Sequence, residues 1–432
     1  MDTDREYLLS LQAVRANASK VLDAANNGEL IHFDYDDQRM AVVADFVTDV
    51  IKRDFGPDKF DQIPPHGRWQ HFDVGGIARV DALCAQWKKE GCEDVKEVTR
   101  RLIDLFFVSV LLDAGAGDHW RFKEPDTEDF YTRSEGIAVA SLHMFTAGAF
   151  ASDASKKCSV DGAGLSALDD DTFIRYFQLS SENPMVGVSS RVQLLKDVGA
   201  SLLKLPEIYG PSGRPGNIVD YLTSSDVDSK TLDYEVLWSC LQRTLIPSWP
   251  ANRTRVKDQP IGDAWPLEIL SLRAQRDNDT RPGTTIQPFH KLTQWLAYSL
   301  TVPFTRVLGY SWAKADLGTG LPEYRNGGLF VDLQVLRLKK HDLEQGQKMS
   351  GQTLPQFDAT SDVIVEWRAM TVALLDQLYG IISDRFGALG VKLSMAQMLE
   401  AGTWKSGREL AATNRPETKS SPILVNGDGT LY

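Results

Sequence analysis

A long run of apolar residues at helical spacing constrains the fold of this 432-residue chain more than any other feature. In residues 360–386 apolar side chains recur at steps of three and four, so they lie on one face of a helix. They are Val363, Trp367, Met370, Leu374, Leu378 and Ile381. Similar amphipathic runs fill much of the remaining sequence, whereas strand-like alternation is scarce, with one weak example in residues 30–35. We therefore predict a mainly α fold.

The loops between these runs predict one multi-helical body. They are rich in Gly, Pro, Asn and Asp, but none is long or biased enough to be a flexible linker between domains. We expect the helical body to cover residues 1–412, with subdomains at about 1–205 and 206–412. Residues 413–432 are polar and irregular, and are expected to form a C-terminal tail.

The charge balance limits the classes of partner. There are 47 Lys and Arg residues against 59 Asp and Glu residues, so the formal net charge is −12. Nucleic acids and anionic membranes require a surplus of cations, so we expect the chain to bind neither. The most apolar stretch, residues 102–112, has roughly eleven residues, too few to span a bilayer. The acidic N-terminus is unlike a secretory signal, and a cytoplasmic protein is expected.

Cysteine and histidine spacing does not predict a metal site. Cys84 and Cys92 lie eight positions apart, and the other two cysteines are isolated, which fits neither a disulfide framework nor a zinc motif. Of seven histidines, only His66 and His71 are close in sequence. We therefore expect no requirement for zinc or iron.

Residues 66–79 form the first of four polar loops that are candidates for a functional site. Two imidazoles, the guanidinium of Arg68 and the carboxylate of Asp73 precede a helix start, where free amide groups favour an anion or hydroxyl ligand. The alternative is structural, with Asp73 capping the helix and Trp69 and Phe72 buried.

The second candidate loop covers residues 120–135. Arg133 and Glu135 are candidates for a ligand site, but a local ion pair on a solvated surface explains them equally well. Asp113 ends the preceding apolar helix, where a carboxylate is electrostatically unfavourable, so a compensating group is expected beside it.

The third loop, residues 259–267, is explained largely by capping. Asp263 is a natural N-cap for a helix that has Pro266 in its first turn, and Trp265 is typical of a core residue. Binding roles for Asp263 and Trp265 remain open beside this structural interpretation.

The fourth region joins residues 289–295, which contain Lys291, to residues 321–332. In the latter, Glu323 and Arg325 flank Tyr324 before a Gly-Gly step. A carboxylate held between apolar helices loses solvation, which raises its pKa and suits it to acid–base catalysis. The alternative is that Glu323 merely pairs with Arg325 on the loop surface.

Several of these segments, taken together, resemble the fungal and bacterial uracil-catabolism protein four family. The segments that carry the resemblance are residues 39–54, 64–69, 71–76, 133–136, 262–265 and 322–328. The similarity covers nearly the whole chain. The family belongs to a pyrimidine-degradation route in which uracil becomes a nucleotide, its ring is opened, and ribosylurea or its phosphate remains to be split.

A fainter similarity links the chain to the queuosine-salvage N-glycosylase family, all-helical enzymes related to DNA glycosylases. The matching positions are Val14-Arg15 and residues 183–186, 289–294 and 322–325, which place Glu323 at a carboxylate of the relatives' active site. One departure concerns an Asp that the relatives carry just beyond the Lys segment, where this chain has Tyr298-Ser299. The resemblance implies a fold that is DNA-glycosylase-like in part.

These resemblances imply an N-glycosidase that hydrolyses the ribose–urea bond of ribosylurea, with the 5′-phosphate as the favoured form. Such cleavage passes through an oxocarbenium-like state and requires neither metal nor organic cofactor. The implied catalytic carboxylates are Glu323, Asp73 and Asp113, and the implied substrate-binding residues are His71, Arg133, Glu135, Asp263, Trp265, Lys291, Tyr324 and Arg325. Residues 66–79, 133–136 and 323–332 are expected to converge on one pocket.

Two alternatives accompany this interpretation. A ureide amidohydrolase of the same route would attack the urea carbonyl, for which a metal cluster or a Ser or Cys nucleophile is usual. A non-catalytic nucleotide- or ureide-binding regulator would bind the same small molecule without turnover.

Overall fold

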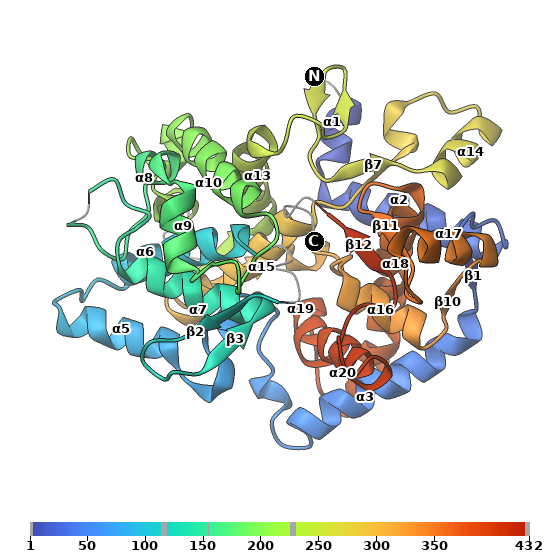
Figure 1. Cartoon of the computed structure of the whole chain (residues 1–432), viewed down its shortest axis with the longest axis horizontal. Helices are drawn as coiled ribbons and strands as arrows, with labels where there is room; N and C mark the ends of the chain where they lie inside the picture. The colour runs from blue at the N-terminus through green and yellow to red at the C-terminus, as the bar shows by residue number, and fades with distance from the viewer. Residues whose placement is uncertain (1–2, 114–118, 154, 225–229, 428–432) are drawn as a thin grey trace. The chain divides into compact units, whose positions relative to one another are not determined.

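The computed structural model describes residues 3–113, 119–153, 155–224 and 230–427. Its ribbon consists mostly of helices, with only short strands between them (Figure 1). The prediction of a mainly α fold is therefore confirmed. Over the described ranges, no helix is long and apolar enough to cross a membrane.

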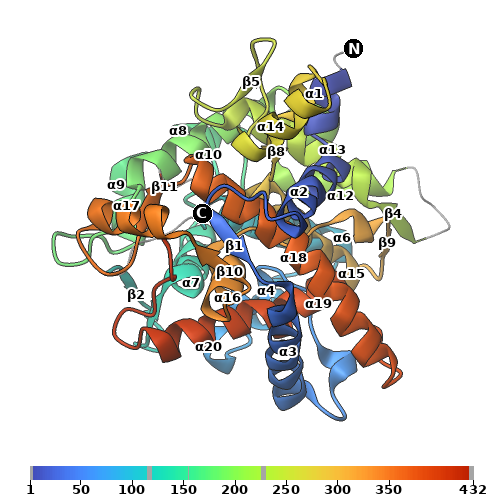
Figure 2. The same ribbon diagram turned by 90° about the vertical axis from the view of Figure 1, so that its right-hand side faces the viewer.

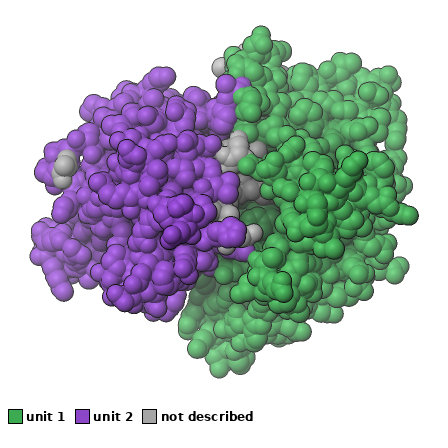
Figure 3. All heavy atoms as spheres, viewed as in Figure 1, with its two compact units in different colours: residues 1–66, 252–291, 316–427 green, residues 67–251, 292–315, 428–432 purple. Residues whose placement is uncertain are grey.

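The chain divides into two compact units, which Figure 3 shows in different colours. Unit 1 consists of Met1–His66, Asn252–Lys291 and Asp316–Gly427, and unit 2 of Gly67–Ala251, Leu292–Ala315 and Asp428–Tyr432. Neither unit is a contiguous half of the chain, because each is held together by packing between segments that are remote in sequence.

Unit 1 is built around helix α18 (Asp362–Gly387), the helix expected at residues 360–386. The other helices of the unit are α1 (Thr3–Leu8), α2 (Leu11–Asn26), α3 (Met40–Phe55), α14 (Glu268–Arg276), α16 (Tyr324–Asp332), α17 (Lys340–Ser350), α19 (Met395–Met398), the π-helix η8 (Leu399–Thr403) and α20 (Trp404–Asn414). Helices α2, α3 and α16 pack on α18, and Figure 2 shows α2 beside it.

Helix α18 is more deeply buried than its apolar stripe predicts. Every residue from 363 to 375 is buried, so the first half of the helix is covered on all sides. Further along, Ile382 is buried and Ile381, expected on the apolar face, is only partly so. A helix covered on all sides must find partners for its charged residues, which here are Glu366 and Arg368.

Short strand pairs hold the loops of unit 1. Antiparallel pairs are β1 (Phe33–Tyr35) with β10 (Leu336–Leu338), β5 (Arg255–Val256) with β6 (Gln259–Pro260), and β7 (Ala264–Pro266) with β8 (Ile286–Pro288). Within the weak alternation of residues 30–35, Phe33–Tyr35 thus form a strand. Strand β11 (Gln356–Asp358) pairs in parallel with β12 (Leu424–Asn426), so the tail contributes one strand to the unit.

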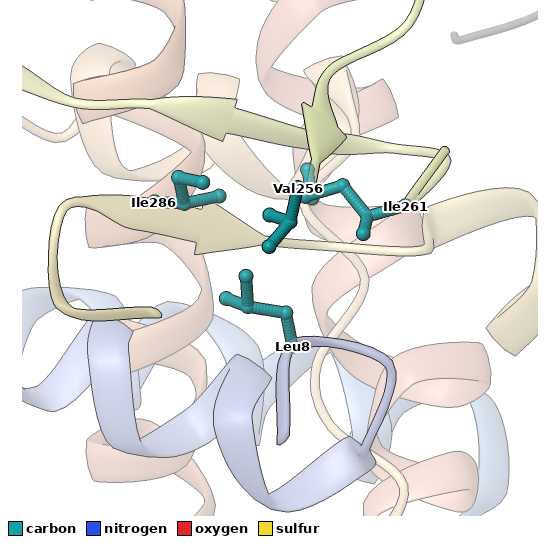
Figure 4. Close-up of a cluster of buried hydrophobic side chains, with 5 residues drawn as sticks. Leu8, Val256, Ile261 and Ile286 are labelled. Atoms are coloured by element: carbon teal, nitrogen blue, oxygen red, sulfur yellow. The ribbon is translucent and has the colours of Figure 1, made fainter. Parts of the chain in front are cut away.

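A small apolar cluster anchors β7 and β8 to the first helix. Its members are Leu8, Val256, Ile261, Ala264 and Ile286, and Figure 4 shows four of these side chains pointing toward one another. Burial of such side chains stabilises by about 1.5–3 kcal/mol each. The cluster therefore fixes the strand that directly follows Asp263.

A charged cluster ties the β1 segment to α18. The buried carboxylate of Glu366 accepts the backbone N–H groups of Ile31 and His32, both at 2.9 Å. The His32 ring lies between two carboxylates, with Nδ1 3.0 Å from Asp342 and Nε2 3.0 Å from Asp362. Burial alone would lower the pKa of His32, but the hydrogen bonds to Asp362 and Asp342 raise it to about 9.

His32→Gln is expected to destabilise the fold by about 2 kcal/mol at pH 6, because the charged imidazole holds two carboxylates together. The folded pKa of His32, about 9, lies above its ordinary value of 6.5, so its contribution is complete below about pH 6.5. The contribution disappears as pH rises through about 9. Urea unfolding at pH 6 and pH 10 should show the penalty shrinking, whereas His341→Gln, at an exposed position, should have little effect at either pH.

Unit 2 is also helical. Its helices are α4 (Trp69–Phe72), α5 (Arg79–Lys89), α6 (Val95–Leu111), α7 (Arg133–Thr146), α8 (Gly162–Ala167), α9 (Asp170–Tyr176), α10 (Val188–Leu203), α11 (Pro206–Tyr209), α12 (Ile218–Thr223), α13 (Tyr234–Leu245) and α15 (Lys291–Arg306) after its first residue. Strand β2 (Arg121–Lys123) pairs with β3 (Phe130–Thr132), and β4 (Thr231–Asp233) pairs with β9 (Ser311–Ala313).

Short 3₁₀ turns connect these elements. They are η1 (Asp37–Arg39), η2 (Phe60–Gln62), η3 (Val74–Gly76), η4 (Pro215–Asn217), η5 (Ile246–Ser248), η6 (Pro282–Thr284) and η7 (Ala315–Leu317).

Residues 102–111 of the apolar stretch are all buried in α6, and the two polar side chains among them, Asp104 and Ser109, are both hydrogen-bonded. Asp104 accepts hydrogen bonds from Arg214 Nε and the Gly216 amide, each at 2.7 Å. Its burial nevertheless raises the pKa of Asp104 to about 6. Ser109 is bonded to Arg68, which leads to the polar cluster described below.

Candidate active site

Glu323 is the N-cap of helix α16, and both of its carboxylate oxygens are held by backbone amides. Oε2 accepts from the N–H of Arg325 and Oε1 from the N–H of Asn326, each at 2.6 Å. The carboxylate therefore sits at the positive end of the helix, in one fixed orientation. The helix begins at Tyr324 and contains the Gly327-Gly328 step, so the expectation that a helix starts only after these glycines is wrong.

Loss of solvation shifts the protonation of Glu323. Desolvation raises the pKa of this carboxyl group to about 7. The hydrogen bond from the Asn326 amide and the positive charges of Lys291 and His66 offset part of the rise. Near neutral pH the group can therefore both accept and release a proton, which is the property that a general acid or base needs.

The simpler interpretation, a surface ion pair between Glu323 and Arg325, does not describe the structure. Across the described residues, no ion pair joins these two side chains. The buried guanidinium of Arg325 donates instead to the carbonyl of Lys419 in the C-terminal tail, at 2.9 Å. The Cζ atom of Arg325 also lies 4.9 Å from the ring centroid of Tyr324. Through these two contacts Arg325 packs the tail against α16.

Asp263 forms the centre of a buried ion pair in the same unit. Its two oxygens accept from Nη1 and Nη2 of Arg368, each at 2.8 Å. Oδ1 also accepts from the indole N–H of Trp265 at 2.9 Å, and Oδ2 from the amide of Lys291 at 3.0 Å. Burial would raise the pKa of Asp263, but the charge and hydrogen bonds of Arg368 hold it well below its usual range.

The expected role of Asp263 as the N-cap of a helix beginning near residue 265 is wrong. Residues Ala264–Pro266 form strand β7, which pairs with β8, and α14 begins only at Glu268. Asp263 instead accepts the amide of the first residue of α15, 28 positions away. Pairing between remote strands outweighed the local capping pattern.

The Asp263–Arg368 pair places Lys291 within electrostatic reach of Glu323. Lys291 is buried, its amide is fixed by Asp263, and its charge lowers the pKa of Glu323. His290, directly before it, has a left-handed backbone with φ of 47°, an uncommon conformation for a residue other than glycine. The left-handed backbone at His290, which sets the direction of the chain at Lys291, is thus held by tertiary contacts.

His66 and Glu400 form a buried pair that the sequence analysis did not identify. His66 Nδ1 lies 2.6 Å from Glu400 Oε2, and each residue is 5% exposed. The two residues are 334 positions apart, so no local pattern predicts the contact. Helix α16, which Glu323 caps, packs on the segment Leu399–Thr403 that carries Glu400, and the charge of His66 also lowers the pKa of Glu323.

Unit 2 contains a second polar cluster around Arg68, which is fully buried. Its Nη1 donates to Asp113 at 2.6 Å and lies 3.2 Å from His71 Nδ1. Its Nε donates to the hydroxyl of Ser109 at 2.8 Å. The expectation that Asp113 has a compensating partner is therefore confirmed, and that partner is Arg68.

Two more charged residues belong to this cluster. Desolvation lowers the pKa of Arg68, and the charges of Asp113 and Glu135 oppose the shift. Arg191 is also buried, donating from Nε to the Leu112 carbonyl at 3.1 Å, and desolvation lowers its pKa to about 10. Neither the burial of Arg68 as an ion-pair partner nor that of Arg191 could be predicted, because nothing in the local sequence marks an arginine as buried.

Asp73 and Arg133 also lie in unit 2, where Asp73 makes the contacts of a structural residue. Asp73 accepts from the Val80 amide in the first turn of α5 and from the indole N–H of Trp69, both at 3.1 Å. Trp69 and Phe72 are buried, as the structural alternative expects. Partial burial raises the pKa of Asp73. Arg133, the first residue of α7, has a left-handed backbone with φ of 54°.

The structure thus groups Glu323, Lys291, Asp263 and Trp265 in unit 1, and Asp113 and His71 in unit 2. The expectation that residues 66–79, 133–136 and 323–332 line one pocket remains a prediction. Within the described ranges, no group of three or more His, Cys, Asp or Glu side chains is arranged to hold a metal ion.

Comparison with known proteins identifies close relatives over the full length. Residues 7–432 match the model of a family described as "Protein of unknown function (DUF1688)". Protein urg3 of Schizosaccharomyces pombe is 46% identical over 426 residues, covering 98% of each chain. Uracil catabolism protein 4 of Lachancea kluyveri is 41% identical over 446 residues, covering all of both chains. The resemblance to the uracil-catabolism protein four family is therefore confirmed.

Proposed function

This chain belongs to the DUF1688 family, and from its similarity to uracil catabolism protein 4 we propose that it acts in uracil catabolism. We further propose that it hydrolyses the N-glycosyl bond of ribosylurea, with the 5′-phosphate as the favoured form. The products are urea and ribose or its phosphate. The observation that carries this proposal is Glu323, a fixed carboxylate with a pKa of about 7.

Breaking the bond between C1′ and the urea nitrogen leaves positive charge on the sugar. An ionised Glu323 stabilises that charge or takes a proton from the attacking water. The two amide hydrogen bonds at 2.6 Å keep its oxygens in place, so little reorganisation accompanies the reaction. Lys291 supplies a nearby cation for the urea carbonyl or the phosphate.

The other predicted residues of unit 1 act mainly by positioning in this proposal. Asp263 already receives hydrogen bonds on both oxygens, so it holds Lys291 and Trp265 rather than a substrate. Arg325 and Tyr324 hold the first turn of α16 against the tail. The roles expected for Asp73, Asp113, His71, Arg133 and Glu135 remain predictions.

One assay separates this proposal from its alternatives. The purified protein is incubated with ribosylurea and, separately, with its 5′-phosphate, while urea, reducing sugar and ammonia are followed independently. An N-glycosidase releases urea and sugar in equal amounts. A ureide amidohydrolase releases ammonia instead, and a regulator binds without turnover. The ratio of kcat/KM for the two substrates decides whether the phosphate is recognised.

The pH dependence of the reaction is expected to report the ionisation of Glu323. If the ionised form is active, kcat/KM rises with pH through an apparent pKa near 7, because the raised pKa keeps the carboxyl protonated below that value. The measurement is a pH–rate profile from pH 5 to 9 for wild type and Glu323→Gln. The variant, which has no carboxyl at this position, should lack the step, and a step that persists would assign it to another group.

A further inference from the structure

The His66–Glu400 pair lies where the local backbone departs from an ordinary helix. Glu400 belongs to η8, a short π-helix between α19 and α20, and such segments occur frequently at functional sites. His66 is tied to the same region by its amide, which donates to the Ala396 carbonyl at 2.8 Å. The pair is thus fixed both by its side chains and by the backbone.

Packing holds the π-helix in place beneath Glu400. A Cβ atom on Gly402 would come within 2.8 Å of Val47 and 3.1 Å of Ile51, so a side chain here would displace α3 residues that now pack against η8. Just beyond, the fully buried hydroxyls of Thr403 and Ser406 have no hydrogen-bond partner among the described residues. Buried hydroxyls are normally hydrogen-bonded, so packing of the fold alone does not explain these two polar side chains.

The hydrogen bond between Glu400 and Nδ1 determines which ring nitrogen of His66 can exchange a proton. Glu400 accepts a hydrogen bond from Nδ1–H, so the ring exchanges a proton at Nε2, on its opposite side. The Trp404 ring, with its centroid 6.1 Å from that of His66, packs beside the imidazole. Helix α16, which Glu323 caps, packs on η8, which carries Glu400, so the imidazole–carboxylate pair and Glu323 belong to one packed region.

We propose that His66, oriented by Glu400, is the acid that protonates the departing urea, an inference that rests on the function proposed above. As the C1′–N bond breaks, its electron pair goes to the urea nitrogen, which takes a proton from His66 Nε2. Water forms the new bond to C1′ and gives its proton to Glu323. Transfer of that proton through solvent to His66 restores both groups, so the net reaction consumes one water. Glu400 is a positioning residue.

The test compares two leaving groups. Urea is a poor leaving group that must be protonated, whereas the 4-nitrophenolate of 4-nitrophenyl ribofuranoside departs without a proton. His66→Asn keeps a donor near the Nδ1 position for Glu400 but removes the acid. We expect kcat for ribosylurea to fall by at least about a hundredfold, and that for the 4-nitrophenyl substrate by less than about tenfold.

Matched variants separate this role from structural effects. Glu400→Gln should show the same selectivity with a smaller loss, and it carries the test if His66→Asn does not fold. Glu323→Gln should lose activity on both substrates. His32→Gln, which breaks another imidazole–carboxylate contact in unit 1, should lower stability without any preference between leaving groups.

The outcomes are distinct. Equal losses on both substrates, or none, would overturn the role of His66 and leave the glycosidase function intact. A wild type that releases no urea and sugar would overturn the function and this role together. If the wild type cleaves ribosylurea but not the 4-nitrophenyl substrate, the leaving-group comparison is replaced by chemical rescue, in which imidazole is added to His66→Gly. Restored urea release then supports the proposal, and its absence contradicts it.

Discussion

Glu323→Gln is expected to lower the turnover of ribosylurea by at least about a hundredfold, roughly 2.7 kcal/mol of activation free energy, with a smaller change in KM. Glutamine preserves the shape of the side chain but cannot carry the negative charge that opposes the developing positive charge on the sugar. The measurement is kcat and KM from urea release, together with the melting temperature of the same sample.

Stability should change little in this variant. Glutamine has one acceptor oxygen for the two amides of Arg325 and Asn326, so part of the helix cap is lost, about 1 kcal/mol. Removal of the poorly solvated carboxyl offsets this loss, and the offset grows from about pH 4.5, where the group ionises in the unfolded chain, to about pH 7, where it also ionises in the fold. Glu344→Gln, at an exposed position on α17, is the matched control. A folded Glu323→Gln with wild-type urea release would remove Glu323 from the mechanism and make Asp73 or Asp113 the next carboxylate to test.

Arg368→Met is expected to destabilise the fold by about 3–5 kcal/mol, because it leaves the Asp263 carboxylate buried without its cation. The guanidinium also lies 4.0 Å from the ring centroid of Phe289, so packing is lost along with charge. The free energy of unfolding is measured in urea at pH 7. Activity should fall as well, because Asp263 fixes the amide of Lys291.

A double-mutant cycle isolates the pair. In Asp263→Asn/Arg368→Met no buried charge is left uncompensated, so the double variant should be less destabilised than the sum of the single changes. The exposed bidentate pair between Arg53 and Glu409 provides the control, since Arg53→Met should cost at most about 1 kcal/mol. Equal losses for Arg368→Met and Arg53→Met would show that burial adds nothing to the Asp263 pair.

Helical periodicity was sufficient to predict the class of the fold. Residues 360–386 become α18 because the spacing of apolar side chains is a property of neighbours in sequence. The same reasoning did not predict that residues 363–375 are buried on every side, since covering all faces depends on which other helices arrive. It also placed a helix start near Trp265, where pairing of β7 with β8 made a strand.

The candidate carboxylates show the same limit. Local context singled out Glu323, Asp263 and Asp113, because a carboxylate next to apolar helices needs a reason to be there. Only the tertiary structure showed that Asp263 is saturated by Arg368, 105 positions away, and that Asp113 is compensated by Arg68.

By itself, then, the sequence determined a mainly α chain, its family and the loops in which charged side chains accumulate. The tertiary structure alone decided which charges meet, as in the pairing of His66 with Glu400 across 334 positions. The physical reason is one of range. Periodicity and capping act over a few residues, whereas desolvation and ion pairing depend on the packing of remote segments, and these set the pKa of Glu323.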